Sequence, residues 1–173
     1  MRTLTEHLTQ YAAYHQDKRN VATHFVGIPL IVVAVATLLS HPQLVVLGVP
    51  ASALLVAWFG IFYLLLDLRF GLAMAVQLAV FFACGQWLAS QGSVTWWLGG
   101  VGLFVLGWVI QFVGHYFEGK KPAFVDDLVG LMVGPLFLTA EAAFAMGLRQ
   151  DLHTEILRRL GAQASGARLG AAA

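Results

Sequence analysis

Charged side chains are scarce in this sequence: they make up 11% of its 173 residues, whereas 59% of the residues are hydrophobic. Soluble domains contain roughly 25% charged and 45–50% apolar residues. A soluble protein of this length could not bury so much apolar surface, because small globules have a high ratio of surface to volume. The composition therefore predicts one domain embedded in a lipid bilayer. The formal net charge of +1 gives no reason to expect a nucleic acid as partner.

Cysteine is nearly absent, since Cys84 is the only one and lies within an apolar run. A disulfide or a cysteine-based metal site within one chain is therefore excluded, and Cys84 is expected to face lipid or the helix core. The N-terminal residues contain no apolar core, so no cleaved secretion signal is expected. Motifs of serine hydrolases, P-loop proteins, zinc proteases and dinucleotide sites are missing. Six histidines are too few for the histidine boxes of membrane desaturases.

Long apolar runs are the dominant feature of the sequence. A bilayer-crossing helix needs about 20 mostly apolar residues, and no alternation of period two points to a β-barrel. Short connections between the runs make sequence neighbours antiparallel neighbours in space. The sequence therefore predicts an all-α membrane bundle with four transmembrane helices, over Phe25–Ser40, Leu44–Leu66, Leu72–Ala89 and Val94–Val113.

A fifth apolar stretch, Leu128–Ala140, is shorter than a full crossing requires. Gly134 and Pro135 are expected to break it near its middle. Two alternatives follow from this stretch. It forms a re-entrant or interfacial element, or it is a kinked fifth span that runs to Leu148.

The distribution of basic residues favours the first alternative. With four crossings, all ten Lys and Arg residues lie on one side, and loops 41–43 and 90–93 on the other side hold none. By the positive-inside rule this side is cytoplasmic. Residues 1–160 are thus predicted to form a single domain, with amphipathic surface helices over 1–23 and 150–160 and a flexible tail over 161–173. The short loops favour a bacterial inner membrane.

Polar residues gather at the cytoplasmic ends of two predicted spans. His24 and His115 lie at these ends, where an ionisable group usually has a partner or a function. Asn20 and His24 are four residues apart, and His115 and Glu118 are three apart, so each pair shares a helix face. Imidazole with carboxylate suits Fe(II), and two histidines with one carboxylate leave coordination positions open.

The residues alone leave two functions open. His15, His24 and His115, at one membrane level and interleaved with acids, fit a metal site. They equally fit a non-enzymatic lipid-binding or scaffold protein whose polar cluster holds headgroups. A transporter is disfavoured, because the spans contain essentially no ionisable residue. The remaining histidines are placed outside the site: His7 in an exposed amphipathic stretch, His41 in the opposite loop and His153 in the terminal helix.

Other charged residues have simpler interpretations. Lys120 and Lys121 are expected to set the topology and to contact lipid phosphates, with contact to a substrate carboxylate as the alternative. Asp126 and Asp127 suit the N-terminus of the helix that begins at Leu128. Small residues on the fourth span permit close helix packing and leave homo-oligomerisation open; these are Gly99, Gly100, Gly102 and Gly107.

Two runs resemble the signatures of a known family. The run YHQDKRNVATHFVGIP contains a Tyr-His pair, an Asn and His-x-x-Gly-Ile-Pro, and the run QFVGHYFEGKKPA contains Gln-x-x-Gly-His-x-x-Glu followed by Pro-Ala. Together with the four-span layout over residues 5–150, they resemble the 2-hydroxy fatty acid dioxygenase family, formerly a domain of unknown function. Its characterised eukaryotic members are Fe(II)-dependent enzymes of the endoplasmic reticulum, which shorten a 2-hydroxy fatty acid by one carbon in α-oxidation.

The resemblance implies the same reaction here, with a 2-hydroxy fatty acid and O2 as substrates and membrane lipids as neighbours. It assigns the metal and catalytic roles to His15, His24 and His115, which lie inside the matching motifs. It adds Glu118 as the candidate carboxylate ligand and Asn20 as a residue that supports the ligands. Lys120 or Lys121 would then steer the substrate carboxylate, and Asp127 and Glu141 remain further candidates for ligands. One iron or two, and the chain length of the substrate, stay open.

Overall fold

The computed structural model describes residues 2–41, 44–122 and 129–170. Within these ranges the chain is almost entirely helical. A short β-hairpin interrupts the helices, and one π-helical turn joins α5 to α6. The elements are α1 (Leu4–Ala13), α2 (Lys18–Leu39), β1 (Val45–Val46), β2 (Val49–Pro50), α3 (Ala51–Leu66), α4 (Leu68–Ser90), α5 (Ser93–Trp97), η1 (Leu98–Gly102), α6 (Leu103–Glu118), α7 (Val129–Ala145) and α8 (Gln150–Gly170).

Three helices of the described chain are long and apolar enough to cross a membrane. They are α2 with 22 residues, α4 with 23, and the unbroken helix Ser93–Glu118 with 26. They contain the first, third and fourth predicted spans. By length and composition a fourth span is added if α7 and α8, which meet at a bend of 115°, count as one broken span, while α3 is a shorter apolar helix. The helical fold is therefore confirmed, and three to four of its helices are candidate membrane spans. The number of crossings stays a prediction.

The second predicted span begins later than its sequence suggested. Residues 45–50 of the expected helix form the antiparallel hairpin β1–β2, in which Val46 pairs with Val49. Leu47 and Gly48 occupy the turn with positive φ values of 52° and 81°, the backbone conformation of a tight hairpin. The helix α3 starts only after Pro50 and has 16 residues. The uniform apolar run concealed this change, because hydropathy alone cannot distinguish a strand from a helix.

The break predicted at Gly134 and Pro135 is wrong, because α7 continues through both residues. Proline removes one backbone hydrogen bond from a helix, but packing compensates for the loss here. Gly134 lies against the hydroxyl end of Tyr11 and the side chain of Ile28, and a methyl group at this position would approach both to about 3.0 Å. Asp126, Asp127 and the predicted start of this helix at Leu128 lie outside the described residues.

The two ends of the chain also differ from expectation. The amphipathic helix predicted over residues 1–23 is shorter, because α1 ends at Ala13 and a new helix begins at Lys18. His7 on α1 was expected to be exposed and is buried. At the other end α8 runs on to Gly170, past the predicted boundary of 160. The flexibility of residues 161–173 stays a prediction.

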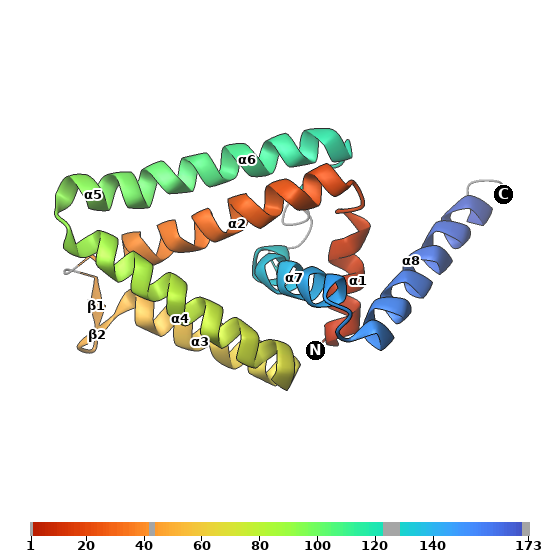
Figure 1. Cartoon of the computed structure of the whole chain (residues 1–173), viewed down its shortest axis with the longest axis horizontal. Coiled ribbons are helices and arrows are strands. Elements are labelled where there is room, and N and C mark those ends of the chain that lie inside the picture. Colours follow the sequence, from red (N-terminus) through yellow and green to blue (C-terminus); the bar gives the residue numbers. More distant parts are fainter. Residues whose placement is uncertain (1, 42–43, 123–128, 171–173) are drawn as a thin grey trace.

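The helices pack so that α2 and α6 lie antiparallel and side by side over most of their length (Figure 1). Backbones approach closely where small residues meet: a side chain at Gly27 would collide with the carbonyl oxygen of Gly107. Gly99 and Gly100 likewise face side chains of α2 or α4. Gly99, Gly100 and Gly107 thus serve packing within the chain, whereas nothing lies within 4 Å of a side chain added at Gly102. Homo-oligomerisation stays a prediction. Helices α1 and α7 lie at the opposite end of the bundle from the hairpin (Figure 1).

Candidate metal centre

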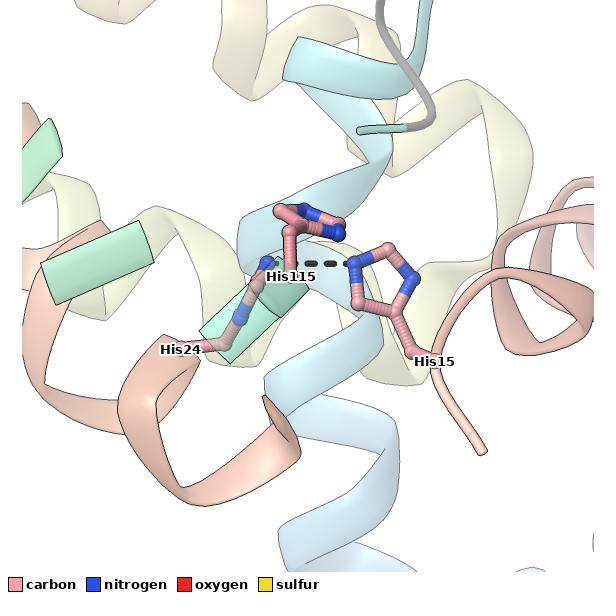
Figure 2. Close-up of side chains that lie close together, drawn as sticks. All are labelled: His15, His24 and His115. Carbon is pink, nitrogen blue, oxygen red and sulfur yellow. Dashed lines mark hydrogen bonds between the residues drawn. The ribbon is translucent and has the colours of Figure 1, made fainter. Parts of the chain in front are cut away.

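Three histidines from distant parts of the sequence meet where α1, α2 and α6 come together. His15 lies in the turn between α1 and α2, His24 in the second turn of α2, and His115 in the last turn of α6. All three side chains are buried, and one nitrogen of each lies within 4.8 Å of the others. Figure 2 shows the three rings turned toward a common centre.

In two of the rings, the nitrogen that points away from the common centre forms a hydrogen bond to a backbone carbonyl oxygen. The Nδ1 atom of His15 lies 2.8 Å from the carbonyl oxygen of Tyr11, and that of His24 lies 2.9 Å from the carbonyl oxygen of Asn20. A carbonyl oxygen only accepts, so each Nδ1 must carry the proton. Each acceptor lies four residues earlier in the chain, one helical turn away. The backbone of the helices thus sets which nitrogen points into the centre.

The inner nitrogens of the same two rings face each other. The Nε2 atoms of His15 and His24 lie 3.1 Å apart (Figure 2). With both Nδ1 atoms protonated, both Nε2 atoms present lone pairs in the neutral rings, and two lone pairs repel at this distance. A cation between them removes the repulsion. Metal-binding histidines usually donate their other N–H to a backbone carbonyl, as these two do, so the donor set fits a metal ion.

His115 completes the group from the other long helix. Its ring centre lies 5.1 Å from that of His15 and 5.0 Å from that of His24. Its Nδ1 atom is buried and has no hydrogen-bond partner among the described protein atoms. A buried nitrogen without a partner is costly in a protein and needs a reason.

The surroundings keep the centre neutral and dry. Burial lowers the pKa of His15 to about 4, so its ring is neutral at physiological pH, the form that binds a metal. The ring of Tyr11 stacks on His15 with 4.0 Å between ring centres, and Phe137 of α7 lies against the same imidazole. These aromatic rings shield one side of the centre from water.

Glu118, the expected carboxylate ligand, lies in a different place. Its carboxylate accepts hydrogen bonds from the backbone N–H groups of Gln16 and Asp17 and from the amide of Asn20, at 2.8–3.1 Å. It is not in the described group of side chains whose donor atoms converge. A carboxylate at the N-terminus of α2 also interacts favourably with the dipole of that helix. Glu118 therefore holds the turn that carries His15.

Asn20, the expected supporting residue, joins two parts of this arrangement. It is fully buried, its amide donates to Glu118, and its carbonyl oxygen receives the Nδ1 proton of His24. One residue thus links the carboxylate to a histidine of the centre. Its own Oδ1 atom is buried without a partner among the described atoms.

The two lysines occupy the rim of the site. The ammonium of Lys120 donates to the carbonyl oxygen of Ala13 at 2.8 Å and lies 4.0 Å from the carboxylate of Glu118. A cation at this position stabilises the C-terminus of α1. Lys121 is exposed. Contact of either lysine with a substrate carboxylate stays a prediction.

Two residues of the site received no role from the sequence, although Gln111 lies in the second family-like motif. Tyr11 supplies both the stacked ring and the carbonyl oxygen for His15, and Gln111 lines a pocket beside His24 and His115. Each lies four residues before one of the histidines, and this spacing was the available signal. Glu141 of α7 is half-buried and outside the converging group, and Asp127 lies outside the described residues.

Comparisons with known proteins agree with the resemblance found in the two motifs. A family model described as 2-hydroxy-palmitic acid dioxygenase Mpo1-like matches residues 1–146. The chain is 33% identical over 151 residues to the 2-hydroxy-palmitic acid dioxygenase MPO1 of Saccharomyces cerevisiae, covering 86% of this chain and 84% of the yeast protein. No solved structure matches. The family match spans α1 to α7 and all three converging histidines, and the chain belongs to the Mpo1-like family.

Proposed function

We propose that this protein is a membrane Fe(II)-dependent dioxygenase that shortens 2-hydroxy fatty acids by one carbon. The observation that carries the proposal is the convergence of His15, His24 and His115 within 4.8 Å in a member of this family. The matched family and the yeast relative are named for dioxygenase activity on 2-hydroxy-palmitic acid. The three histidines would hold the iron.

The donor set suits this chemistry. Neutral imidazoles are ligands for ferrous iron, and three of them on one side of the ion leave coordination positions open. When bound, the iron would supply a Lewis acid for the carboxylate and hydroxyl of the substrate and a site for O2. The reaction balances without a further reductant, because a 2-hydroxy acid and O2 give the acid one carbon shorter, CO2 and water.

Residues around the histidines would position the reactants. Gln111 lies one turn before His115, and its Oε1 atom is buried without a partner among the described atoms. We assign it to the hydroxyl of the substrate, since a buried acceptor requires a donor. Glu118 and Asn20 are positioning residues, which act by holding His15 and His24.

The same proposal includes the orientation in the membrane. We place the histidine centre at the cytoplasmic side of a bacterial inner membrane, with α3 as a fourth crossing and α7 as a re-entrant or interfacial element. In this arrangement all ten Lys and Arg residues face the cytoplasm. Membrane lipids would then surround the exposed apolar side chains of the long helices, such as Val76 on α4 and Val105 on α6.

The proposal is tested on protein purified in detergent under nitrogen and supplied with Fe(II). We expect iron to bind, and O2 to be consumed as 2-hydroxypalmitate is converted to the acid with one carbon less, measured by mass spectrometry. His115→Ala should lose both iron and turnover. His41→Ala, which changes a histidine that contacts Trp96 at the opposite end of the bundle, serves as the matched control.

The results that contradict the proposal are equally specific. Full iron retention in His115→Ala would refute the assignment of ligands. A wild-type protein that binds no metal and tolerates His115→Gln, but co-purifies with phospholipid, would instead identify a headgroup-binding protein.

A further inference from the structure

An apolar cleft begins at the histidine centre and continues into the bundle. Its first part, the near chamber, lies beside His24, Gln111 and His115 and has a volume of about 80 Å³. Its second part, the far chamber, has a volume of about 270 Å³ and reaches Ser52 and Val56 on α3. Most of the surface that lines both chambers is apolar.

The two chambers are parts of one cleft, because they share a wall. Five residues line both of them: Ile31 and Val32 on α2, Trp108 on α6, and Leu131 and Pro135 on α7. Trp108 lies two helical turns before His115 and lines both chambers.

The length of the cleft matches one lipid tail. Along α2 it extends from His24 to Ala36, and along α6 from His115 to Phe104. At 1.5 Å per helical residue these distances are about 18 Å and about 17 Å. Two opposed tails fill a hydrocarbon core of about 30 Å, so one acyl tail reaches about 15 Å.

The few polar groups of the far chamber are already engaged. The hydroxyl of Ser52 contacts the hydroxyl of Ser40 at 3.0 Å and the amide of Gln86 at 3.4 Å. The hydroxyl of Tyr63 donates to the carbonyl oxygen of Met132. The chamber therefore offers its occupant an apolar wall and selects hydrocarbon over a polar ligand.

We propose that this cleft binds the acyl tail of the 2-hydroxy fatty acid, and that its far end sets the longest tail accepted. The inference rests on the proposed function, which places the polar head of the substrate at the histidines. Because the cleft adjoins the histidine centre, we identify its occupant as the tail of the substrate. The lining farthest from the histidines includes Ala36, Ser52 and Phe104, and Val56 lines the same chamber one turn after Ser52 on α3.

The first experiment changes the length of the cleft. Val56→Trp fills its far end, and Val32→Trp fills it midway, about 12 Å from His24 along α2. We expect Val56→Trp to lower turnover of the longest 2-hydroxy fatty acids roughly tenfold while preserving turnover of shorter ones. Val32→Trp should move the limit to still shorter tails. Val105→Trp, on the exposed face of α6, is the control.

A second experiment separates this inference from the proposed function. A 2-hydroxy fatty acid with a diazirine at the end of its tail is photolysed on the metal-free protein, so that neither iron nor turnover is required. Labels on the segments around Ser52, Val56 and Phe104, lost in Val56→Trp, would support the cleft even if no dioxygenase activity were found. Labels confined to lipid-facing residues such as Val105, or an unchanged chain-length profile in both tryptophan variants of an active enzyme, would overturn it.

Discussion

The Nε2 atoms of His15 and His24 lie 3.1 Å apart, while the opposite nitrogen of each ring binds a backbone carbonyl one turn earlier. The protein therefore holds two lone pairs close together, in a region where burial disfavours a charged imidazole. The repulsion between the two lone pairs is unfavourable without a cation, and a cation bound between them removes it. Under the proposed function, metal binding and folding would therefore be coupled at this point.

We expect a divalent metal to stabilise the folded protein in proportion to its occupancy. At a free metal concentration of 100 times Kd the gain is about 2.7 kcal/mol. It should be visible as a rise in Tm when Fe(II), or a redox-stable surrogate, is added to metal-free protein in detergent. His24→Ala should lose this rise. His153→Ala, which removes a ring stacked on Phe144, should keep it, and an equal response in both variants would argue against the centre.

Glu118→Gln should weaken metal binding without removing a ligand. The neutral amide can no longer hold the backbone N–H groups of Gln16 and Asp17 as a carboxylate does, so the turn that carries His15 loosens. Residues that orient metal ligands typically contribute about 10–100-fold to affinity. Chelator competition measures the change. Glu155→Gln, on the exposed part of α8, is the matched substitution, and a similar loss there would show a general effect of charge.

Gly114→Ala should disrupt the centre from the helix interface. A methyl group at this position would collide with Thr23 and Asn20, so α6 must move away from α2 and carry His115 with it. We expect a destabilisation of about 1–3 kcal/mol together with weaker metal binding. Gly102→Ala is the control, because nothing lies within 4 Å of the added methyl. It should be neutral or stabilise the helix by about 0.5–1 kcal/mol, and equal effects of the two substitutions would refute the packing argument.

The ion pair between Asp67 and Arg149 should make stability depend on pH. Burial acts to raise the pKa of Asp67, but hydrogen bonds from the N–H of Phe70 and from Arg149 outweigh it and hold the pKa below its ordinary value. A depressed pKa contributes stability that is present above the ordinary value and is lost as pH falls through the folded-state value.

Asp67→Asn should therefore cost about 1 kcal/mol at neutral pH and flatten the acid side of the Tm profile. Asparagine caps the N-terminus of α4 about as well as aspartate does, so the substitution keeps the cap. The loss of stability therefore measures the ion pair with Arg149. Arg149→Met should give the same profile, and the double variant should add little. Additive losses would show that the two side chains act independently.

Hydropathy and motif spacing predicted the helices that carry the site, but not the breaks between elements. The hairpin at Leu47 and Gly48 has the same apolar composition as the helix after it, so no change in composition marks the boundary. At Pro135 the local signal for a break was overridden by the packing of Gly134 against Tyr11. Tertiary contacts of this kind cannot be read from local propensity.

The sequence predicts that the histidines lie together, but it does not predict the contacts of their neighbours. His24 and His115 lie at the same end of antiparallel helices, which places them together once the topology is known. Glu118 was expected at the metal because it lies three residues after His115 on the same helix. Its carboxylate instead meets the N–H groups of Gln16 and Asp17, about a hundred residues earlier in the chain, a contact that depends on how α6 ends against the start of α2.

The origin of the three donors in two distant segments has a consequence for biosynthesis. His15 and His24 leave the ribosome almost together, whereas His115 follows about a hundred residues later, a delay of roughly 5–20 s at ordinary rates of synthesis. During this interval the nascent chain offers only two of the three converging imidazoles. The three imidazoles come together only after α6 has packed against α2, so under the proposed function the loading of metal would be a late step that only a correctly assembled bundle can complete.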